Sequence, residues 1–540
     1  MPCLSDVSLL RSIPLTSLTT IAVVLVLAVL TTVVAAVLLP RTVPATAGAS
    51  SADEPTRLTR PALRTVLRGV GRYTARTAMV GVPVLLVVVL GGLLINRPMH
   101  YVRTVGDLAK AAAPRTQANS RIESPPKSSA FGTAPASAWK ASFHDVGDGS
   151  QEATWTGPVS GITLPVRVVL PAGYRPNDGR TYNVLVGLHG WVGDPQSLVT
   201  GIASPQRLQE AIDAGRIPPS ILVFPSLNAD GASQPDCVNI NGRPPVGTWT
   251  AEEIPRMIQA TFPNVTTQRA GWMIMGISAG AYCAARTAYD VPQRFGSVGV
   301  MSSYDLPGEG SLAHSGKELQ AQNGLSSMLG KRKPDGMRFY VLGAQDDPYS
   351  TARTAWSMDE AARRPDSVTV DTPAKGGHSW TLWNNHFPSL LAWWGSDPAV
   401  FAAAGLPAPQ GDAKAKATAA GVKPLSETSK DQRAARPASP VRAKPFEVNG
   451  LGTMIVAVVV SLGALGVVLF WSPRWGRRRD GGKRSVARLG GAILGRVVVI
   501  LVAAGLVAVT VGIGANASGG FYTSWGDLWA SVRTSELPGK

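Results

Sequence analysis

Four long apolar stretches stand out in the pattern of hydrophobic and polar positions along this chain of 540 residues. They cover about residues 17–39, 77–96, 451–471 and 497–515, with almost no charge inside them. Each is about 20 residues long, the length that a helix needs to cross the hydrocarbon core of a bilayer. Because short basic loops flank them, membrane spans are favoured over buried core helices. The pattern predicts two membrane-spanning pairs, one toward each end of the chain.

Between the two pairs, short apolar runs alternate with amphipathic segments. Residues 205–214 predict a helix with Ser204 as its N-cap, and residues 250–262 predict another with a capping box of Thr250 and Glu253. Continuous apolar runs are typical of parallel strands that are buried on both faces. Such runs occupy 166–170, 183–188, 220–225, 272–275, 297–301, 337–342 and 367–370. This alternation predicts an α/β domain with a central, mostly parallel sheet.

Composition divides the chain further. Residues 110–136 and 404–446 are rich in Ala, Pro, Ser, Lys and Thr, so we expect a linker on each side of the 137–403 domain, the second one disordered. The membrane pairs are then 1–109 and 447–540. Each pair ends on a span followed by Asn, Tyr and Gly-Asp-Leu, beginning at Asn96 and Asn516. This order favours a duplicated module that forms one four-helix unit, although chance and the preference of Tyr and Trp for membrane interfaces could also produce it.

The net charge of +17 is concentrated in the two loops between paired spans, at residues 41–76 and 474–496. Both loops are short, so the positive-inside rule places them in the cytoplasm and the middle domain outside the plasma membrane. The basic residues are then a topology signal that also contacts anionic lipid headgroups. We do not expect nucleic-acid binding. We expect the first span to be a retained anchor, because the residues before it carry Asp6 and no basic residue up to Leu10.

Two of the three cysteines, Cys237 and Cys283, fall in the region expected outside the membrane. Disulfides persist in such compartments. A Cys237–Cys283 bridge would fix the loop after the 220–224 strand to the segment after residue 278. Two free buried thiols are the alternative.

The sequence Gly276-Ile277-Ser278-Ala279-Gly280 follows an apolar strand and precedes a predicted helix. Strand, G-x-S-x-G and helix form the context of a nucleophile elbow, in which a tight turn exposes the serine hydroxyl. The motif alone is weak evidence in a chain rich in Gly and Ala, so its interpretation depends on an acid and a histidine later in the chain.

Both partners follow in the order Ser, Asp, His. Asp346 and Asp347 come just after the 337–342 strand, and we favour Asp346 as the triad acid with Asp347 as the alternative. His378 lies in a Gly-Gly loop and would act as general base toward Ser278. His386 is expected to be a surface residue. The backbone N–H groups of Trp191 and Ala279 are the candidate oxyanion hole, and His189 is expected to be structural.

The motifs together resemble the putative-esterase family, which includes esterase D, feruloyl esterases and mycobacterial mycolyltransferases. The resemblance covers about 160–395 and rests on residues 168–174, 188–190, 276–280 and 377–383. It implies an α/β-hydrolase fold, with triad roles for Ser278, Asp346 and His378 and an oxyanion hole at Trp191 and Ala279. Ala281 departs from the family pattern, which has a second glycine there, and the Asp346-Asp347 pair leaves the acid in doubt.

The sequence therefore predicts a membrane-anchored serine esterase or acyltransferase that acts on an ester or acyl-lipid substrate. Hydrolysis and acyl transfer use the same residues, so both stay open, and the protein partners are unknown. We expect no cofactor and no metal, since no cluster has metal-ligand spacing. Trp380, Trp383, Trp393 and Trp394 could line an acyl or sugar site, but core positions are the simpler interpretation. The alternative function is an inactive hydrolase-fold scaffold or binding protein of the cell envelope.

Overall fold

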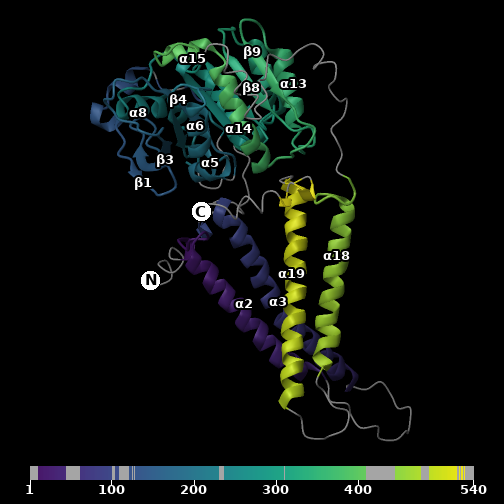
Figure 1. The fold of residues 1–540 in the computed structure, drawn as a ribbon. Coiled ribbons are helices and arrows are strands. Elements are labelled where there is room, and N and C mark those ends of the chain that lie inside the picture. Colours follow the sequence, from purple (N-terminus) through teal and green to yellow (C-terminus); the bar gives the residue numbers. More distant parts are fainter. Residues whose placement is uncertain are drawn as a thin grey trace, which may run out of the picture. The chain divides into compact units, whose positions relative to one another are not determined.

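A computed structural model describes most of the chain and divides it into two compact units. Described are residues 10–43, 61–99, 104–106, 108, 121–124, 126, 128–191, 193–229, 236–308, 310–408, 444–475, 486–519, 522, 524–526 and 528–529. One unit comprises Met1–Ser12, Met99–Ala443 and Gly520–Lys540, and the other comprises Ile13–Pro98 and Lys444–Gly519 (Figure 1). We call them the catalytic unit and the membrane unit. Residues 409–443 of the second predicted linker, about half of the first linker and parts of both basic loops lie outside the described residues.

The catalytic unit is built on one nine-stranded sheet with the order β1-β2-β3-β5-β4-β6-β7-β8-β9. The strands are β1 (His144–Asp145), β2 (Gln151–Thr156), β3 (Thr163–Val169), β4 (Asn183–Leu188), β5 (Ser220–Pro225), β6 (Trp272–Ile277), β7 (Ser297–Met301), β8 (Arg338–Leu342) and β9 (Ser367–Asp371). Along the sheet from β5 through β4, β6, β7 and β8 to β9, every pair of neighbouring strands is parallel. The pairs β1–β2, β2–β3 and β3–β5 are antiparallel. Every residue of β4, β5, β6 and β7 is buried, as expected for parallel strands covered on both faces. The predicted fold class is confirmed.

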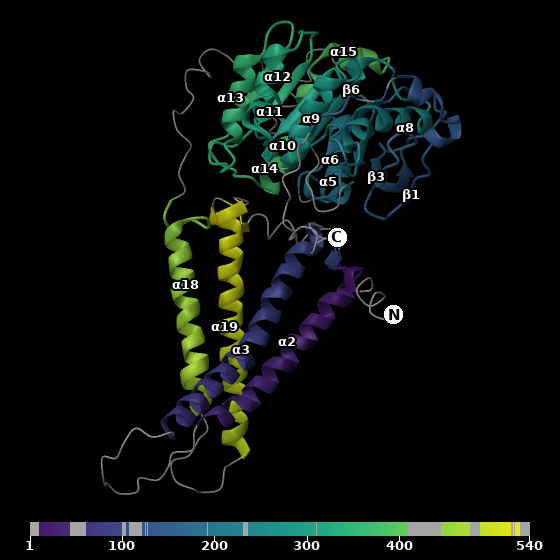
Figure 2. The same cartoon turned by 180° about the vertical axis from the view of Figure 1, so that it is seen from behind.

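Helices cover both faces of this sheet (Figures 1 and 2). One face packs against residues of α8 (Ile254–Thr261), α9 (Ala279–Asp290), α12 (Leu325–Lys331) and α13 (Thr351–Ala361). The other packs against residues of α5 (Pro195–Gly201), α6 (Ser204–Asp213), α14 (Trp380–Gly395) and α15 (Pro398–Ala403). The shorter helices are α7 (Val246–Thr248), α10 (Gly310–Ala313) and α11 (Lys317–Gln322). Two hydrophobic cores result, one on each side of the sheet.

The helix that includes Thr250 differs from its prediction. The chain is already helical at α7 and passes through one π-helical turn, Trp249–Glu253, before α8. Thr250 donates to the carbonyl of Val246 (2.9 Å), and the Glu253 carboxylate accepts the N–H of Val159 (2.7 Å). The predicted capping box is therefore wrong, because Glu253 binds a loop that is distant in the sequence. Ser204 is the first residue of α6, and Ala203 is the N-cap.

The membrane unit contains α2 (Leu18–Leu38), α3 (Pro61–Met99), α18 (Leu451–Gly466) and α19 (Val486–Gly519). Within it, Leu18–Thr42, Val70–Arg97, Leu451–Arg474 and Val486–Ala517 are long and apolar enough to cross a membrane. The prediction of four apolar helices is confirmed. The four helices lie together at the end where α2 and α18 finish (Figures 1 and 2), and Ala35, Ala36, Val80, Val468, Ile500 and Ala503 form a buried cluster there.

Candidate active site

Ser278 occupies the sharp turn between β6 and α9. Its backbone has φ 54° and ψ −122°, a conformation that costs free energy for a residue with a side chain and that is concentrated at functional sites. The flanking glycines are required by space. A Cβ at Gly276 would lie 2.0 Å from the carbonyl oxygen of Gly280, and a Cβ at Gly280 would lie 2.1 Å from that of Leu188. The predicted strand, turn and helix are therefore present, with the serine at the end of the strand.

His378 lies on the loop between β9 and α14 and meets the serine. Its Nε2 is 2.8 Å from Ser278 Oγ, and the residue is 6% exposed. The ring is held between two aromatic side chains, Tyr349 at 4.8 Å and Trp383 at 5.2 Å between ring centroids. In this geometry Nε2 is in position to receive the hydroxyl proton.

The carboxylate that contacts His378 belongs to Asp347. Its Oδ2 is 2.9 Å from His378 Nδ1 and also accepts the hydroxyl of Thr351 at 2.8 Å, while its Oδ1 accepts the N–H of Tyr349 at 2.9 Å. Asp347 is 2% exposed, so its hydrogen bonds are shielded from solvent.

Asp346, the acid favoured from the sequence, faces a different group. Its Oδ1 accepts the N–H of Gly377 at 2.8 Å, so it binds the backbone of the histidine loop and not the imidazole. These contacts favour the alternative, Asp347, over Asp346 as the triad acid. Adjacent side chains on this turn point in different directions, and no local sequence signal tells which one faces the ring.

The loop after β4 approaches Ser278 from the other side. A Cβ on Gly190 would lie 3.2 Å from Ser278 Cβ, so the absence of a side chain allows this close approach. His189 is buried: its Nε2 accepts the N–H of Leu227 at 2.9 Å, which leaves the ring proton on Nδ1, 2.9 Å from the Gly190 carbonyl oxygen. His189 thus has the expected structural position, and it holds the loop that contains Trp191.

The two predicted oxyanion donors occupy different settings. Ala279 is the first residue of α9, so its N–H has no partner within the helix and lies at the positive end of the helix dipole. Trp191 follows Gly190 directly and is half-buried. Both residues belong to segments that contact Ser278, but which N–H groups would bind an oxyanion remains a prediction.

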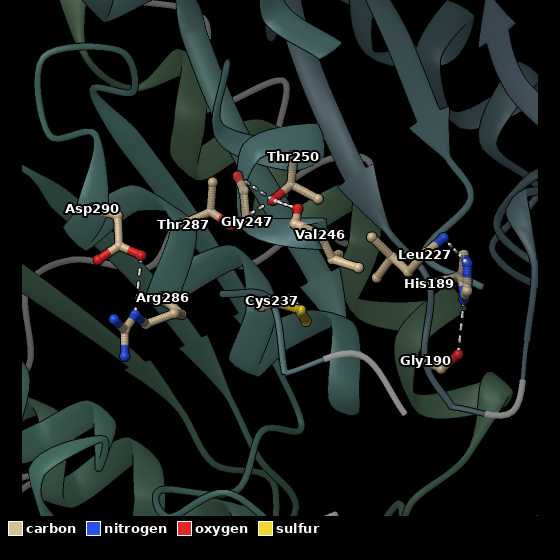
Figure 3. Close-up of a disulfide and its surroundings, with 11 residues drawn as sticks. His189, Gly190, Leu227, Cys237, Val246, Gly247, Thr250, Arg286, Thr287 and Asp290 are labelled. Carbon is tan, nitrogen blue, oxygen red and sulfur yellow. Dashed lines mark hydrogen bonds and ion pairs between the residues drawn. A yellow bond between two sulfur atoms is a disulfide. The ribbon is translucent and has the colours of Figure 1, made fainter. Parts of the chain in front are cut away.

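Cys237 and Cys283 form a disulfide with a Cα–Cα distance of 5.2 Å, within the usual range. It connects the loop after β5 to α9, the helix that begins at the serine. Figure 3 shows Cys237 between Arg286 and Asp290 on one side and His189 and Leu227 on the other. The predicted pairing is present. Ala281, the departure from the family pattern, is buried in the core of the same helix without disturbing it.

Two features near the site had no sequence signal. Trp383 donates its indole N–H to Ser302 Oγ at 3.0 Å, and Ser302 is fully buried just after β7. His386, expected at the surface, is instead half-buried and pairs with Asp371, with Nδ1 and Oδ2 2.6 Å apart. The spacing of aromatic and charged residues along α14 did not show which of them face the sheet.

The other tryptophans of α14 differ in how far they are buried. Trp393 and Trp394 are core residues, 4% and 0% exposed, whereas Trp380 is half-buried. Among the described residues, no group of three or more His, Cys, Asp or Glu could hold a metal ion.

Comparison with known proteins identifies the class. Residues 160–394, which contain all the site residues above, match the family model described as "Putative esterase". This match assigns residues 160–394 to the esterase family and supports a carboxylic ester hydrolase. No curated protein matches the chain.

Solved structures similar to this chain include a ferulic acid esterase, with 19% identity, TM-score 0.39, and coverage of 45% of this chain and 96% of that one. An S-formylglutathione hydrolase from Agrobacterium tumefaciens has 15% identity, TM-score 0.38, and coverage of 47% and 97%. FphF, a fluorophosphonate-binding serine hydrolase from Staphylococcus aureus, has 13% identity, TM-score 0.37, and coverage of 47% and 98%. At these identities and TM-scores, the similarities assign no residue role or substrate to this chain.

Proposed function

We propose that this protein is a membrane-anchored serine esterase or acyltransferase that acts through Ser278, His378 and Asp347. The observation that carries the proposal is the continuous relay from Ser278 Oγ to His378 Nε2 and from His378 Nδ1 to Asp347 Oδ2, at 2.8 and 2.9 Å. A buried carboxylate keeps the Nδ1 proton in place, so that Nε2 is free to accept the proton of the serine.

The reaction has two halves. Ser278 Oγ attacks the ester carbonyl as its proton passes to His378, and the leaving alcohol takes that proton when the acyl-enzyme forms. Water, or a hydroxyl of an acceptor, then attacks the acyl-enzyme and gives its proton to His378, and the acyl product leaves as Ser278 is regenerated. The N–H groups of Ala279 and Trp191 stabilise the oxyanion in both halves; loss of one such donor costs about 3 kcal/mol.

The substrate that we propose is an ester or acyl lipid at the membrane surface. Anchoring by four apolar helices keeps the catalytic unit close to lipid. Tyr349, 46% exposed, packs on the His378 ring, so its exposed face can cover an apolar acyl group next to the serine.

We place the catalytic unit outside the plasma membrane. The charge distribution supports this orientation through the positive-inside rule, and the Cys237–Cys283 disulfide supports an oxidising compartment. The orientation can be tested with an Arg68→Cys variant in a Cys3→Ser background. A membrane-impermeant maleimide is expected to label it only after the cells are opened, and labelling of intact cells would reverse the topology.

Fluorophosphonate labelling of the full chain tests the activity, because such probes react with a serine that its base has activated. We expect the wild type to be labelled and Ser278→Ala not to be. Ser303→Ala is the matched control, since Ser303 also follows a strand of the same sheet, is buried, and donates its hydroxyl to the backbone carbonyl of Tyr304 at 2.9 Å. A folded wild type that is not labelled would favour the inactive scaffold.

A further inference from the structure

The first and third helices of the membrane unit end in the same way. α2 continues into a short turn at Leu39–Thr42 that contains Pro40, and α18 continues through Val467–Trp471 into a turn at Ser472–Arg474 that contains Pro473. Proline has no N–H, so it cannot donate to the carbonyl four residues earlier. The carbonyl groups of Ala36 and Leu469 therefore lose their usual helical donors.

Arg496 of α19 donates to the first of these carbonyls. Its side chain is 2% exposed, and Nη1 lies 2.9 Å from the oxygen of Ala36. The same guanidinium donates to Ser472 O at 3.1 Å and to Trp475 O at 2.6 Å, at the end of α18. Arg496 thus joins the C-terminal ends of α2 and α18, although 460 residues separate it from Ala36.

Arg76 of α3 makes the reciprocal contact. It is 6% exposed, and Nη1 lies 3.4 Å from the oxygen of Leu469, the second carbonyl without its helical donor. Its other donors remain in its own half, with Nε 2.7 Å from Thr42 Oγ1 and Nη2 3.1 Å from Thr42 O. Each arginine thus binds the Pro-Arg turn of its own half and the carbonyl exposed by the proline of the other half.

The residues that make these reciprocal contacts occur at equivalent positions in the two halves of the sequence. The same 420-residue spacing separates Arg76 from Arg496, Asn96 from Asn516 and Gly106 from Gly526. Thr42 and Trp475, which accept from the arginines, each follow their proline by two positions. The two halves are thus equivalent in the positions that supply the contact.

We propose that Arg76, Arg496 and the turns at Pro40 and Pro473 form a reciprocal arginine clasp, which makes each membrane pair the binding partner of the other. A backbone carbonyl that is shielded from water needs a hydrogen-bond donor in the protein, and the clasp supplies one for the two carbonyls that proline leaves open. The positive charges lie where α2 and α18 present the negative ends of their dipoles. Ala35, Ala36 and Ala503 allow the helices to approach closely at this point.

The clasp can be tested in the full chain with a protease site inserted at residue 425, in the segment predicted to be a linker. The chain is cut in the membrane and dissolved in dodecyl maltoside, and the N-terminal fragment is captured through a tag. We expect the C-terminal fragment to stay bound in the wild type. Arg76→Leu and Arg496→Leu are each expected to reduce the retained fragment about tenfold, since each leaves buried carbonyls without donors. Arg72→Leu and Arg488→Leu are matched controls, because these arginines are exposed on the same helices.

Second substitutions at the two prolines distinguish the clasp from a general requirement for arginine at these positions. Pro40→Ala restores an N–H that can donate to Ala36 O, so it is expected to recover part of the loss in Arg496→Leu but not in Arg76→Leu. Pro473→Ala is expected to do the opposite. The amount of each variant protein in the membrane is also measured. We expect this amount to fall in the Arg→Leu variants and to recover with the same choice of proline substitution. Full retention in both Leu variants, equal losses in the matched controls, or rescue without regard to which proline is changed would each overturn the clasp.

Discussion

The assignment of Asp347 as the triad acid gives the sharpest test of the site, because its neighbour Asp346 provides an isosteric control. The change is Asp347→Asn, which keeps the shape of the side chain and removes its charge. Asp347 Oδ2 receives two hydrogen bonds, from His378 Nδ1 and the Thr351 hydroxyl, and Oδ1 receives the N–H of Tyr349.

An asparagine cannot reproduce these bonds. If its NH2 group faces His378, it donates to Nδ1, so the ring proton moves to Nε2 and that nitrogen can no longer accept the proton of Ser278. If the amide is turned the other way, its NH2 meets the N–H of Tyr349, and two donors then face each other. The first arrangement stops general-base catalysis, and we expect it to dominate because the facing donors destabilise the second. In a serine protease triad the equivalent change lowers kcat by about 10⁴, and we expect a loss of that order here.

Asp346→Asn is expected to have little effect, within about threefold, because an amide oxygen can still accept the N–H of Gly377. The assay is the hydrolysis of p-nitrophenyl acetate by the full chain in detergent, with the rate of fluorophosphonate labelling as a second readout. Near-equal losses in the two variants, or an Asp347→Asn enzyme that keeps more than a tenth of its kcat, would refute the assignment.

Three further changes test the surroundings of the site. Replacing Cys237 and Cys283 together by serine removes a crosslink across 46 residues and is expected to lower the free energy of unfolding of the catalytic unit by about 4 kcal/mol; denaturant melts that are unchanged, with and without reductant, would contradict the bridge. Gly190→Ala places a methyl group 3.2 Å from Ser278 Cβ, so kcat is expected to fall about tenfold while the melting temperature changes by only a few degrees; an unchanged kcat would show that the loop can move away. Trp383→Phe removes the donor to Ser302 Oγ but keeps a ring near His378, and its loss of kcat, also about tenfold, is expected to exceed that of Trp394→Phe, a core substitution that leaves the histidine untouched.

The sequence predicted the arrangement of the catalytic unit because its strands are continuous apolar runs of the length that a buried parallel sheet requires. It also located Ser278 and His378, since a nucleophile elbow needs glycines at fixed spacing and a Gly-Gly loop after the last strand marks the histidine. These signals are local, and the backbone conformations that produce them depend on adjacent residues.

The residues adjacent to Asp346 and Asp347 do not determine which of the two carboxylates faces His378. Both follow the same strand, and only the fold of the turn, with Asp347 bound to the N–H of Tyr349 and the hydroxyl of Thr351, turns one carboxylate toward the imidazole. Glu253 gives the same lesson: the sequence indicated a helix cap, but its carboxylate binds the N–H of Val159, 94 residues away.

The membrane helices show most clearly which features the sequence determines and which depend on the tertiary structure. Hydrophobicity by itself located the four helices, because the thickness of a bilayer sets the minimum length of the apolar run that crosses it. The burial of Arg76 and Arg496 was decided by the packing of the two pairs, since each arginine finds its acceptor, Leu469 or Ala36, on a helix hundreds of residues away. A partner chosen across such a distance depends on how whole helices fit together, and only the tertiary structure contains that information.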